Sequence, residues 1–337
     1  MKIGVIGGGS WGTALAKLLA DKGDDVQLWC YDDGLPDIIN TQHENTMYLP
    51  GFTLADNLTG TQDLKEVVQD KELILSVSPS HVVRHVLSQV AHDIPECVPI
   101  VSATKGIENE SLMLVSDILQ DVLPSRLHPY LAYLSGPSFA KEVAAHKPTA
   151  VTVASYNPAV AREVQEVFSA DYFRCYSTHD VVGVEIGGAV KNVIAIASGV
   201  ISAMDLGHNA TAGMITRGLN EITRLGVKLG ANPLTLSGLA GMGDLVLTCT
   251  GGLSRNRTVG FKLGSGMTLQ EILDDMNMVA EGIKTSRSVY NLSKNLGVEM
   301  PITEQVYKVI YENKPTAQAV QDLMARDLKP EMLGLYG

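Results

Sequence analysis

The sequence predicts an α/β protein in which a doubly wound sheet domain is followed by an all-helical domain. In the first half, short β-rich apolar runs alternate with helical patterns, which is typical of a parallel sheet wrapped by crossover helices. After about Val181 the strand patterns stop, and segments with apolar residues at spacings of three and four continue to the C-terminus. A length of 337 residues fits two domains. We therefore predict a sheet domain over residues 1–180 and a helical domain over residues 181–337.

Seven short apolar runs are the expected strands: Lys2–Ile6, Val26–Tyr31, Leu73–Val77, Pro99–Ser102, Leu131–Leu134, Ala150–Ala154 and Phe173–Tyr176. The helical patterns between them are Thr13–Asp21, Val82–Ala91, Leu112–Val122 and Ala159–Phe168. The helical domain should contain Val181–Ala203, Met214–Leu229, Leu269–Met276, Ile283–Leu296 and Thr303–Tyr311, separated by Gly, Pro and Asn breaks.

Composition excludes several classes of protein. A formal net charge of −11 argues against an electrostatic nucleic-acid binder, because phosphate backbones are bound by clustered Lys and Arg. The four cysteines are far apart and lack a C-x-x-C pair, which argues against a zinc ribbon or a disulfide framework. They are Cys30, Cys97, Cys175 and Cys249. We expect a reduced, cytoplasmic setting.

Two segments bear on targeting. Met1-Lys2 runs directly into an apolar strand pattern, so no signal peptide is expected. Val181–Ala203 is long enough to cross a bilayer, but it carries Glu185, Lys191 and Asn192 near its middle. We interpret it as a buried helix and expect no membrane span.

A glycine-rich turn follows the first expected strand and opens the first expected helix, with the sequence Gly7-Gly8-Gly9-Ser10-Trp11-Gly12. In a G-x-G-x-x-G turn the first glycine permits the tight turn and the second lets the backbone approach a pyrophosphate. The third lets the helix pack closely on the strand, and the N-terminus of the helix attracts the phosphates. The motif in this context predicts a Rossmann-type domain that binds NAD or NADP.

The second expected strand ends in Tyr31-Asp32-Asp33. A carboxylate here accepts hydrogen bonds from a ribose 2′-hydroxyl and repels a 2′-phosphate. The acids therefore favour NAD, although two acids in a surface turn could also serve solubility, and NADP stays open.

Lys191 lies in the middle of an apolar helical run. Burying an ammonium is costly, so a lysine there is a candidate acid–base group, although a lysine that extends to the surface is the alternative. Gly187 and Gly188 share its helix face and are expected to leave room for a ligand. Asp244 follows an apolar run and a glycine pair, and it either caps a helix or orients Lys191.

Loops with hydrogen-bond donors complete the candidate site. The run from Ser254 to Arg257 is suited to clamp a phosphate or carboxylate, and a solvated basic turn is the alternative. Two further loops follow strands, one with Lys105 and one with small, donor-rich residues from Ser135 to Glu142. His81 and His85 have zinc-ligand spacing, but no third ligand is evident and we expect no metal.

These residues lie within longer runs that resemble the bacterial NAD(P)-dependent glycerol-3-phosphate dehydrogenases, and the resemblance covers nearly the whole chain. The runs are GGGSWGTALA at Gly7–Ala16, SATKGIE at Ser102–Glu108, LSGPSFAKE at Leu134–Glu142, IGGAVKNVIAIASG at Ile186–Gly199, GLAGMGDLVLTCTGGLSRNRTVG at Gly238–Gly260 and VAEGIKT at Val279–Thr285.

The resemblance implies reversible reduction of dihydroxyacetone phosphate to sn-glycerol 3-phosphate, the entry to phospholipid synthesis, by a cytoplasmic homodimer. It makes Lys191 the general acid/base, with Asp244 orienting it and Lys105 assisting. The implied substrate site is Lys105, Gly136, Ser138, Lys191, Asp244, Ser254, Arg255 and Asn256. The implied contacts to the dinucleotide are Ser10, Trp11, Lys105, Ala140, Arg255, Val279 and Glu281. Members of the family often have Arg or Lys near Tyr31-Asp32, which suits NADP, whereas this chain has acids.

Two other functions stay open on the sequence. A 3-hydroxyacid dehydrogenase shares a Rossmann domain, a helical domain and a lysine in an apolar helix, but its carboxylate substrate would not require so many donors at Ser254–Arg257. In a dinucleotide-binding redox sensor without catalysis, Lys191 and Asp244 would be structural.

Overall fold

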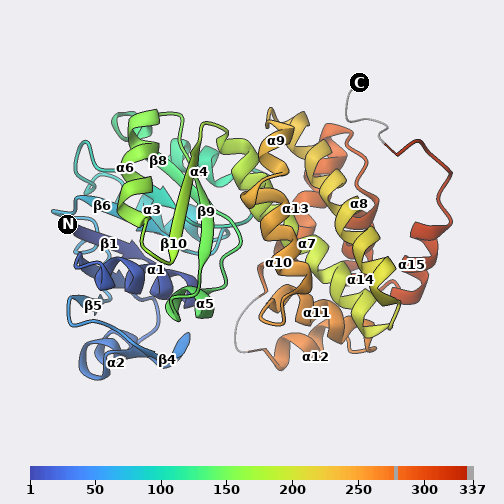
Figure 1. The fold of residues 1–337 in the computed structure, drawn as a ribbon, viewed down its shortest axis with the longest axis horizontal. Helices are drawn as coiled ribbons and strands as arrows, with labels where there is room; N and C mark the ends of the chain where they lie inside the picture. Colours follow the sequence, from blue (N-terminus) through green and yellow to red (C-terminus); the bar gives the residue numbers. More distant parts are fainter. Residues whose placement is uncertain (277–279, 332–337) are drawn as a thin grey trace. The chain divides into compact units, whose positions relative to one another are not determined.

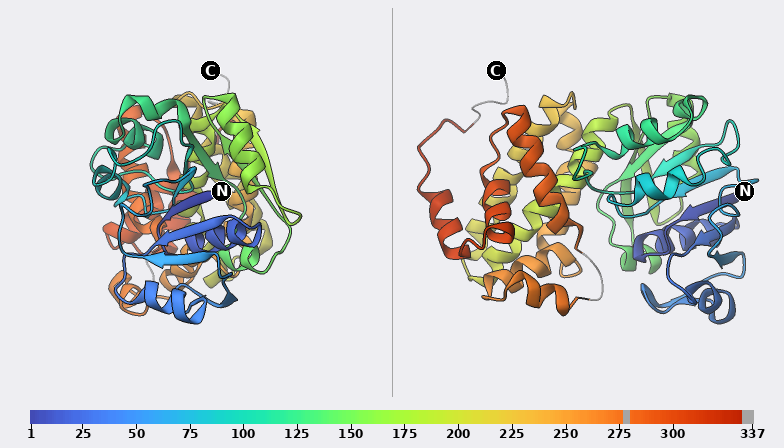
Figure 2. Two further views of the ribbon diagram at one scale, coloured as in Figure 1. Left: turned by 90° about the vertical axis from the view of Figure 1, so that its left-hand side faces the viewer. Right: turned by 180° about the vertical axis from the view of Figure 1, so that it is seen from behind.

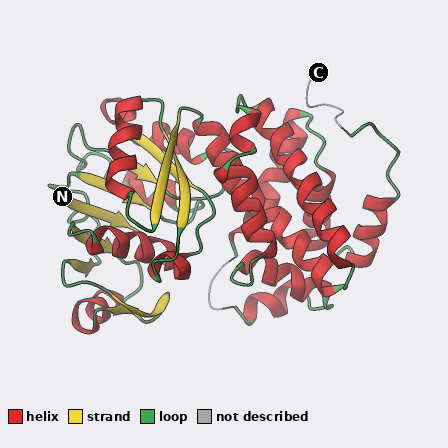
Figure 3. Ribbon diagram, viewed as in Figure 1, coloured by secondary structure: helices red, strands yellow, loops and turns green. Residues whose placement is uncertain are grey.

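The computed structural model describes residues 1–276 and 280–331, and the chain divides into two compact units. Unit 1 comprises Met1–Lys105 and Val115–Val184, and unit 2 comprises Gly106–Leu114 and the chain from Glu185 onward. Within the described ranges, every strand belongs to unit 1 (Figure 3).

Unit 1 is built on ten strands: β1 (Lys2–Ile6), β2 (Asp25–Trp29), β3 (Glu44–Asn45), β4 (Leu49–Thr53), β5 (Leu58–Thr61), β6 (Leu73–Ser76), β7 (Ile100–Ser102), β8 (Leu131–Ser135), β9 (Thr149–Ala154) and β10 (Phe173–Thr178). Its helices are α1 (Ser10–Asp21), α2 (Leu35–Gln42), α3 (Val83–Ser88), α4 (Val115–Val122), the 3₁₀ helix η1 (Ser125–Tyr130), α5 (Ala140–Ala144) and α6 (Pro158–Phe168). All seven expected strands are present: β1 has the predicted bounds, and the ends of the other six differ by one or two residues. β3, β4 and β5 were not predicted.

Eight strands form one sheet in the order β10-β9-β8-β7-β6-β1-β2-β5 (Figure 1). The chain leaves β1 toward β2 on one side and later returns to β6 on the other, which makes the end of β1 a topological switch point. Helices α1, α5 and α6 pack together and α3 packs with α4, so helical layers cover both faces of the sheet (Figure 2). The predicted doubly wound Rossmann-type fold is confirmed.

The expectation of a wholly parallel sheet is wrong at one pair of strands. β9 runs antiparallel to β8, with Tyr133 opposite Ala154, whereas β10 is again parallel to β9. A parallel neighbour needs a crossover that returns the chain to the starting end of the sheet. The link over residues 136–148 carries only the five-residue α5, and the chain turns back instead. The alternation of strand and helix patterns does not reveal this reversal.

The core of unit 1 forms where apolar faces of helices meet the sheet. In α1 the side chains of Leu15, Leu18 and Leu19 are fully buried, at the spacing that one face of a helix requires. Phe168 ends α6 and Phe173 begins β10, and both are fully buried in the same core. Cys30 and Cys175 are buried in this core, Cys97 is exposed, and Cys249 is buried in unit 2.

Unit 2 is helical. Its elements are α7 (Val181–Ala203, which begins in unit 1), α8 (Gly207–Lys228), α9 (Pro233–Leu236), the π-helix η2 (Leu239–Gly243), α10 (Asp244–Thr250), α11 (Arg255–Gly264), α12 (Leu269–Asp274), α13 (Glu281–Leu296), α14 (Pro301–Tyr311) and α15 (Thr316–Met324). The five helices expected here are present, and α8 begins seven residues earlier than Met214.

Helix α7 is the core of this unit. It is the one single helix in the described ranges that is long and apolar enough to span a bilayer, and 89% of its most apolar window is buried inside the protein. α11 packs directly on it, because Gly260 has no side chain: a Cβ there would lie 1.8 Å from the backbone oxygen of Ile196. This close contact fixes α11 against α7.

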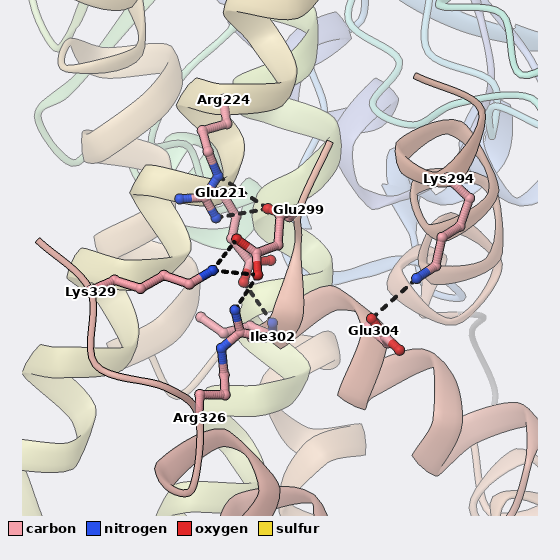
Figure 4. Close-up of polar contacts among 8 residues, drawn as sticks. All are labelled: Glu221, Arg224, Lys294, Glu299, Ile302, Glu304, Arg326 and Lys329. Atoms are coloured by element: carbon pink, nitrogen blue, oxygen red, sulfur yellow. Dashed lines mark hydrogen bonds and ion pairs between the residues drawn. The ribbon is translucent and has the colours of Figure 1, made fainter. Parts of the chain in front are cut away.

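A buried carboxylate caps α14 from another helix. Glu221 of α8 accepts a hydrogen bond from the backbone N–H of Ile302 at 2.6 Å, at the start of α14 (Figure 4). It accepts another from the backbone N–H of Thr303 at 3.1 Å. Nearby, the side chains of Arg326 and Lys329 pair with Glu299, which ties the C-terminal segment to the chain before α14. Burial is the main cause that raises the pKa of Glu221 to about 7, and it outweighs these hydrogen bonds and Arg224.

Candidate active site

The glycine turn at the end of β1 has the geometry that its sequence predicts. Gly7 has a φ of +124°, and a Cβ there would lie 3.0 Å from the carbonyl carbon of Val77. A Cβ on Gly12 would lie 1.9 Å from the oxygen of Gly7, so α1 can approach the turn only without a side chain. Among the described residues, nothing lies within 4 Å of the position that a Cβ on Gly9 would take.

The N-terminus of α1 fits a phosphate group. Its N-cap is Gly9, which has no side chain that could cap the first turn of the helix. The positive end of the helix dipole attracts anionic groups, and the position that a Cβ on Gly9 would take is open. The turn has the shape and the donors that a pyrophosphate requires.

Asp32 lies just beyond the end of β2, and its carboxylate is held by a residue from another element. The hydroxyl of Tyr48, between β3 and β4, donates to Oδ2 of Asp32 at 2.8 Å. Burial, followed by this hydrogen bond, raises the pKa of Tyr48 to about 12. Asp33 accepts from Gln62 at 2.8 Å, and Tyr31 is 81% exposed.

A second group of predicted residues meets at the turn after β8. The backbone oxygen of Gly136 accepts from the Lys105 ammonium (3.3 Å) and from the Ser138 hydroxyl (3.0 Å). Gly136 has a φ of +154°, and a Cβ there would lie 2.8 Å from Cα of Val151. At the start of α5, Ala140 packs with Trp11 on the same small apolar cluster. Unit 1 thus assembles Lys105, Gly136 and Ser138 at one turn.

In unit 2, Lys191 and Asp244 form a buried ion pair. The ammonium of Lys191 donates to Oδ1 of Asp244 and to the hydroxyl of Thr248, the latter at 3.0 Å. Asp244 is fully buried and Lys191 is 7% exposed. Thr248 lies one turn after Asp244 on α10 and donates to its backbone oxygen at 2.6 Å. A buried amine fixed by a carboxylate and a hydroxyl is suited to deliver and accept a proton.

The expectation that Gly187 leaves room for a ligand is wrong. A Cβ on Gly187 would lie 2.3 Å from the backbone oxygen of Ala240, so the space is filled by η2. The glycine serves helix packing: it lets η2 approach α7 closely, and α10, which carries Asp244, follows η2 directly. A glycine on the same helix face as a lysine can leave room for a ligand or let another backbone approach closely. The sequence alone does not distinguish these two roles.

The Ser254–Arg257 run forms the N-terminus of α11. Ser254 is the N-cap, and its hydroxyl accepts from the backbone N–H of Arg257 at 3.2 Å. Arg255 is exposed, whereas Asn256 is buried and accepts from the backbone N–H of Gly282 at 2.9 Å. This bond joins α11 to the start of α13, where Glu281 is the first residue. Val279 lies outside the described residues.

Several residues that shape the site have no strong sequence signal. From a short hairpin, Asn45 contacts the glycine turn and Tyr48 contacts Asp32. Nothing local in the sequence indicates these contacts. Thr248 could have been found, because it lies four residues after Asp244 and therefore on the same helix face.

Comparison with known proteins agrees with this arrangement. A family model described as the N-terminus of NAD-dependent glycerol-3-phosphate dehydrogenase matches residues 2–161, and one described as its C-terminus matches residues 180–321. A curated protein from Leptospira biflexa, named glycerol-3-phosphate dehydrogenase [NAD(P)+], is 56% identical over 98% of this chain and 99% of its own.

Solved structures of similar proteins share both units. The crystal structure of glycerol-3-phosphate dehydrogenase from Coxiella burnetii has a TM-score of 0.92 at 39% identity, over 96% of this chain and 99% of its own. The glycerol-3-phosphate dehydrogenase of Saccharomyces cerevisiae has a TM-score of 0.82 at 31% identity, over 97% of this chain and 99% of its own. The chain belongs to the NAD-dependent glycerol-3-phosphate dehydrogenase family.

Proposed function

We propose that this chain catalyses the reversible reduction of dihydroxyacetone phosphate to sn-glycerol 3-phosphate with NADH or NADPH. The observation that carries the proposal is the buried contact of Lys191 with Asp244 and Thr248, in a chain of this family. A carbonyl reduction needs a proton at the oxygen as well as a hydride at the carbon, and Lys191 is the group suited to supply it.

Unit 1 carries the candidate binding residues for the pyrophosphate and the adenosine ribose of the cofactor. Gly7, Gly9, Gly12 and the N-terminus of α1 bind the pyrophosphate, and Asp32 accepts hydrogen bonds from the adenosine ribose. The further candidate cofactor contacts are Ser10, Trp11, Tyr31, Lys105, Ala140, Arg255 and Glu281. Because Asp32 is an acid, we expect NADH to be preferred over NADPH.

In unit 2, Arg255 and the N-terminus of α11 bind the phosphate of the substrate, with Ser254 and Asn256 beside them. A guanidinium offers a planar fork of donors to phosphate oxygens. In unit 1, Lys105, Gly136 and Ser138 meet at one turn and are further candidate contacts to the substrate.

The chemistry is a hydride transfer coupled to a proton transfer. Bound NADH or NADPH supplies the hydride to the carbonyl carbon of the substrate. Nζ of Lys191 donates a proton to the carbonyl oxygen, and it takes this proton back in the reverse direction. Asp244 and Thr248 hold Nζ in place throughout, which removes the need to order a flexible lysine in the transition state.

We also propose a cytoplasmic homodimer that supplies sn-glycerol 3-phosphate to phospholipid synthesis. The sequence resemblance to the bacterial family supports this proposal. Light scattering of the purified protein should give the mass of two chains, and the mass of one chain would contradict the dimer.

The fall in NADH absorbance on adding dihydroxyacetone phosphate tests the reaction. We expect rapid oxidation of NADH with this substrate and slow oxidation with unphosphorylated dihydroxyacetone or a 3-oxo acid. Faster turnover of the 3-oxo acid would assign the chain to a 3-hydroxyacid dehydrogenase activity, and no turnover of any of them would leave a binding protein. Repeating the assay with NADPH measures the cofactor preference.

A further inference from the structure

The carboxylate of Asp32 is held by a residue from another segment of the chain. Its hydrogen bond comes from the hydroxyl of Tyr48, 16 residues further along the chain, at 2.8 Å. Asp32 itself follows β2 in a turn, where a side chain is free to rotate unless another group holds it. The orientation of this acid therefore depends on where Tyr48 is placed.

Tyr48 is fixed to the glycine turn through both of its backbone groups. Its backbone oxygen accepts from the hydroxyl of Ser10 at 2.6 Å, and its backbone N–H donates to Oδ1 of Asn45 at 3.0 Å. Ser10 is the first residue of α1, directly beside the open position at Gly9.

Asn45 anchors the other end of this connection. It is fully buried, and its amide donates to the backbone oxygen of Gly8 at 2.9 Å and to the hydroxyl of Thr13 at 2.8 Å. Asn45, Tyr48 and Asp32 thus form a continuous chain of hydrogen bonds from the pyrophosphate turn to the ribose acid. Such a chain fixes the position of the acid relative to the turn.

We propose that Tyr48 is a positioning residue for cofactor selectivity: it holds the Asp32 carboxylate in the orientation that accepts the ribose hydroxyls of NADH and opposes the 2′-phosphate of NADPH. The proposal rests on the proposed function, in that Asp32 faces the ribose. The phenol occupies one carboxylate oxygen and leaves the other able to accept from a ligand. Because the pKa of Tyr48 is raised to about 12, the hydroxyl remains a donor at every pH at which the enzyme works.

In the wild type, the free protein already holds the Asp32 carboxylate in one orientation. If the phenol is removed, the entropic cost of ordering this carboxylate has to be met when the cofactor binds. Without the phenol the carboxylate rotates freely, so binding of NADH must order it, and the affinity for NADH falls. The same freedom lets the carboxylate turn away from a 2′-phosphate, so binding of NADPH improves or is unchanged. Selectivity should therefore fall while turnover of bound cofactor remains.

Tyr48→Phe removes the hydroxyl and keeps the ring. We expect KM for NADH to rise about tenfold, the size expected for one hydrogen bond to a charged group, with kcat within about twofold of wild type. The ratio of kcat/KM for NADH over NADPH should fall by a similar factor. Tyr176→Phe is the matched control, because it deletes an exposed phenol on β10, and it should leave both KM values unchanged.

A double-mutant cycle separates positioning from a general structural role. If Tyr48 acts through Asp32, Tyr48→Phe should have no further effect on KM for NADH in an Asp32→Ala background. An equal loss of affinity for NADH and NADPH, a loss that persists in the Asp32→Ala background, or no change at all would overturn the proposal. A wild type that prefers NADPH would also overturn it.

Fluorescence titration without substrate measures the affinities for NADH and NADPH directly. This measurement does not depend on whether the enzyme turns over dihydroxyacetone phosphate. If wild type binds NADH selectively and Tyr48→Phe loses that selectivity, the inference stands even when dihydroxyacetone phosphate is not turned over. Absence of turnover would contradict the proposed function alone.

Discussion

At the scale of single residues, Lys191 shows how a costly burial becomes useful. An ammonium in the core of unit 2 is tolerated because Asp244 and Thr248 both contact it. The sequence predicted a buried role for Lys191 from its place in an apolar run. For Asp244 it left two roles open, capping a helix or orienting Lys191. The contact between them joins residues 53 positions apart, and only the packing of α10 against α7 brings them together.

Lys191→Ala should remove the proton donor and leave NADH binding intact. We expect kcat to fall by about 10² to 10⁴, the range for a general acid–base group. Stopped-flow or steady-state oxidation of NADH measures the loss, and NADH titration by fluorescence checks binding. Lys294→Ala, which removes a surface lysine paired with Glu304, is the control. A kcat near that of wild type in Lys191→Ala would refute the assigned role.

Arg255 is the residue that we propose to bind the phosphate group of the substrate. Arg255→Ala should raise KM for dihydroxyacetone phosphate by about tenfold or more, since a charge-assisted pair to phosphate is lost, and should change KM for dihydroxyacetone little. Comparing the two substrates in one assay measures this. Arg217→Ala, at an exposed arginine on α8, serves as the matched surface variant. Equal effects on both substrates would argue against a phosphate contact.

At the scale of elements, seven of the eight strands of the large sheet were predicted, whereas its edge strand β5 and the short hairpin were not. β1 and β6 to β8 are apolar runs buried on both faces, which sequence patterns indicate well. By contrast, β4 contains Pro50 and Gly51 and is largely exposed, and β3 has two residues. Propensity is weak in such segments. Asn45 and Tyr48 lie in this hairpin, so their role could not be predicted from the sequence.

The cap of α14 predicts a dependence of stability on pH. The pKa of Glu221 is about 7 in the folded protein, above its ordinary value of 4.5. The folded state therefore binds this proton more tightly than the unfolded chain does. Its contribution to the free energy of unfolding is complete below about pH 4.5 and is lost as the pH rises through about 7.

Glu221→Gln should remove this dependence while keeping the shape of the side chain. Relative to the variant, wild type should lose stability between about pH 5 and about pH 8, measured as the urea midpoint at each pH. Glu304→Gln, at a surface acid on α14, is the control: Lys308 and Lys294 lower the pKa of Glu304, so its contribution to stability should stay constant over this pH range. A gain in the relative stability of wild type over the same range would mean that the start of α14 stabilises the ionised form.

At the scale of the whole molecule, a protein with a net charge of −11 must bind two anionic ligands. The negative field acts over long distances, whereas the attraction comes from Arg255, Lys105 and helix N-termini in contact with the ligands. Salt screens the long-range repulsion more completely than the attraction between groups in contact, because the Debye length is about 10 Å at 0.1 M.

The dissociation constant of NADH should therefore depend on salt in two phases. We expect it to fall or stay constant between about 10 mM and 100 mM NaCl, as the repulsion is screened, and to rise at about 1 M, where contact pairs also weaken. Fluorescence titration at each salt concentration measures it. A steady rise from the lowest concentration would show that local positive charge outweighs the net charge of the molecule.

The burial of the thiols has a practical consequence. Burial raises the pKa of Cys30, Cys175 and Cys249 to about 12, so these three thiols are neutral and shielded in the folded protein. Of the four cysteines, all of which lie in the described ranges, Cys97 is the exposed one. A maleimide dye should attach at this position under native conditions. As denaturant is added, alkylation of Cys30 and Cys175 would report the opening of unit 1, and alkylation of Cys249 the opening of unit 2.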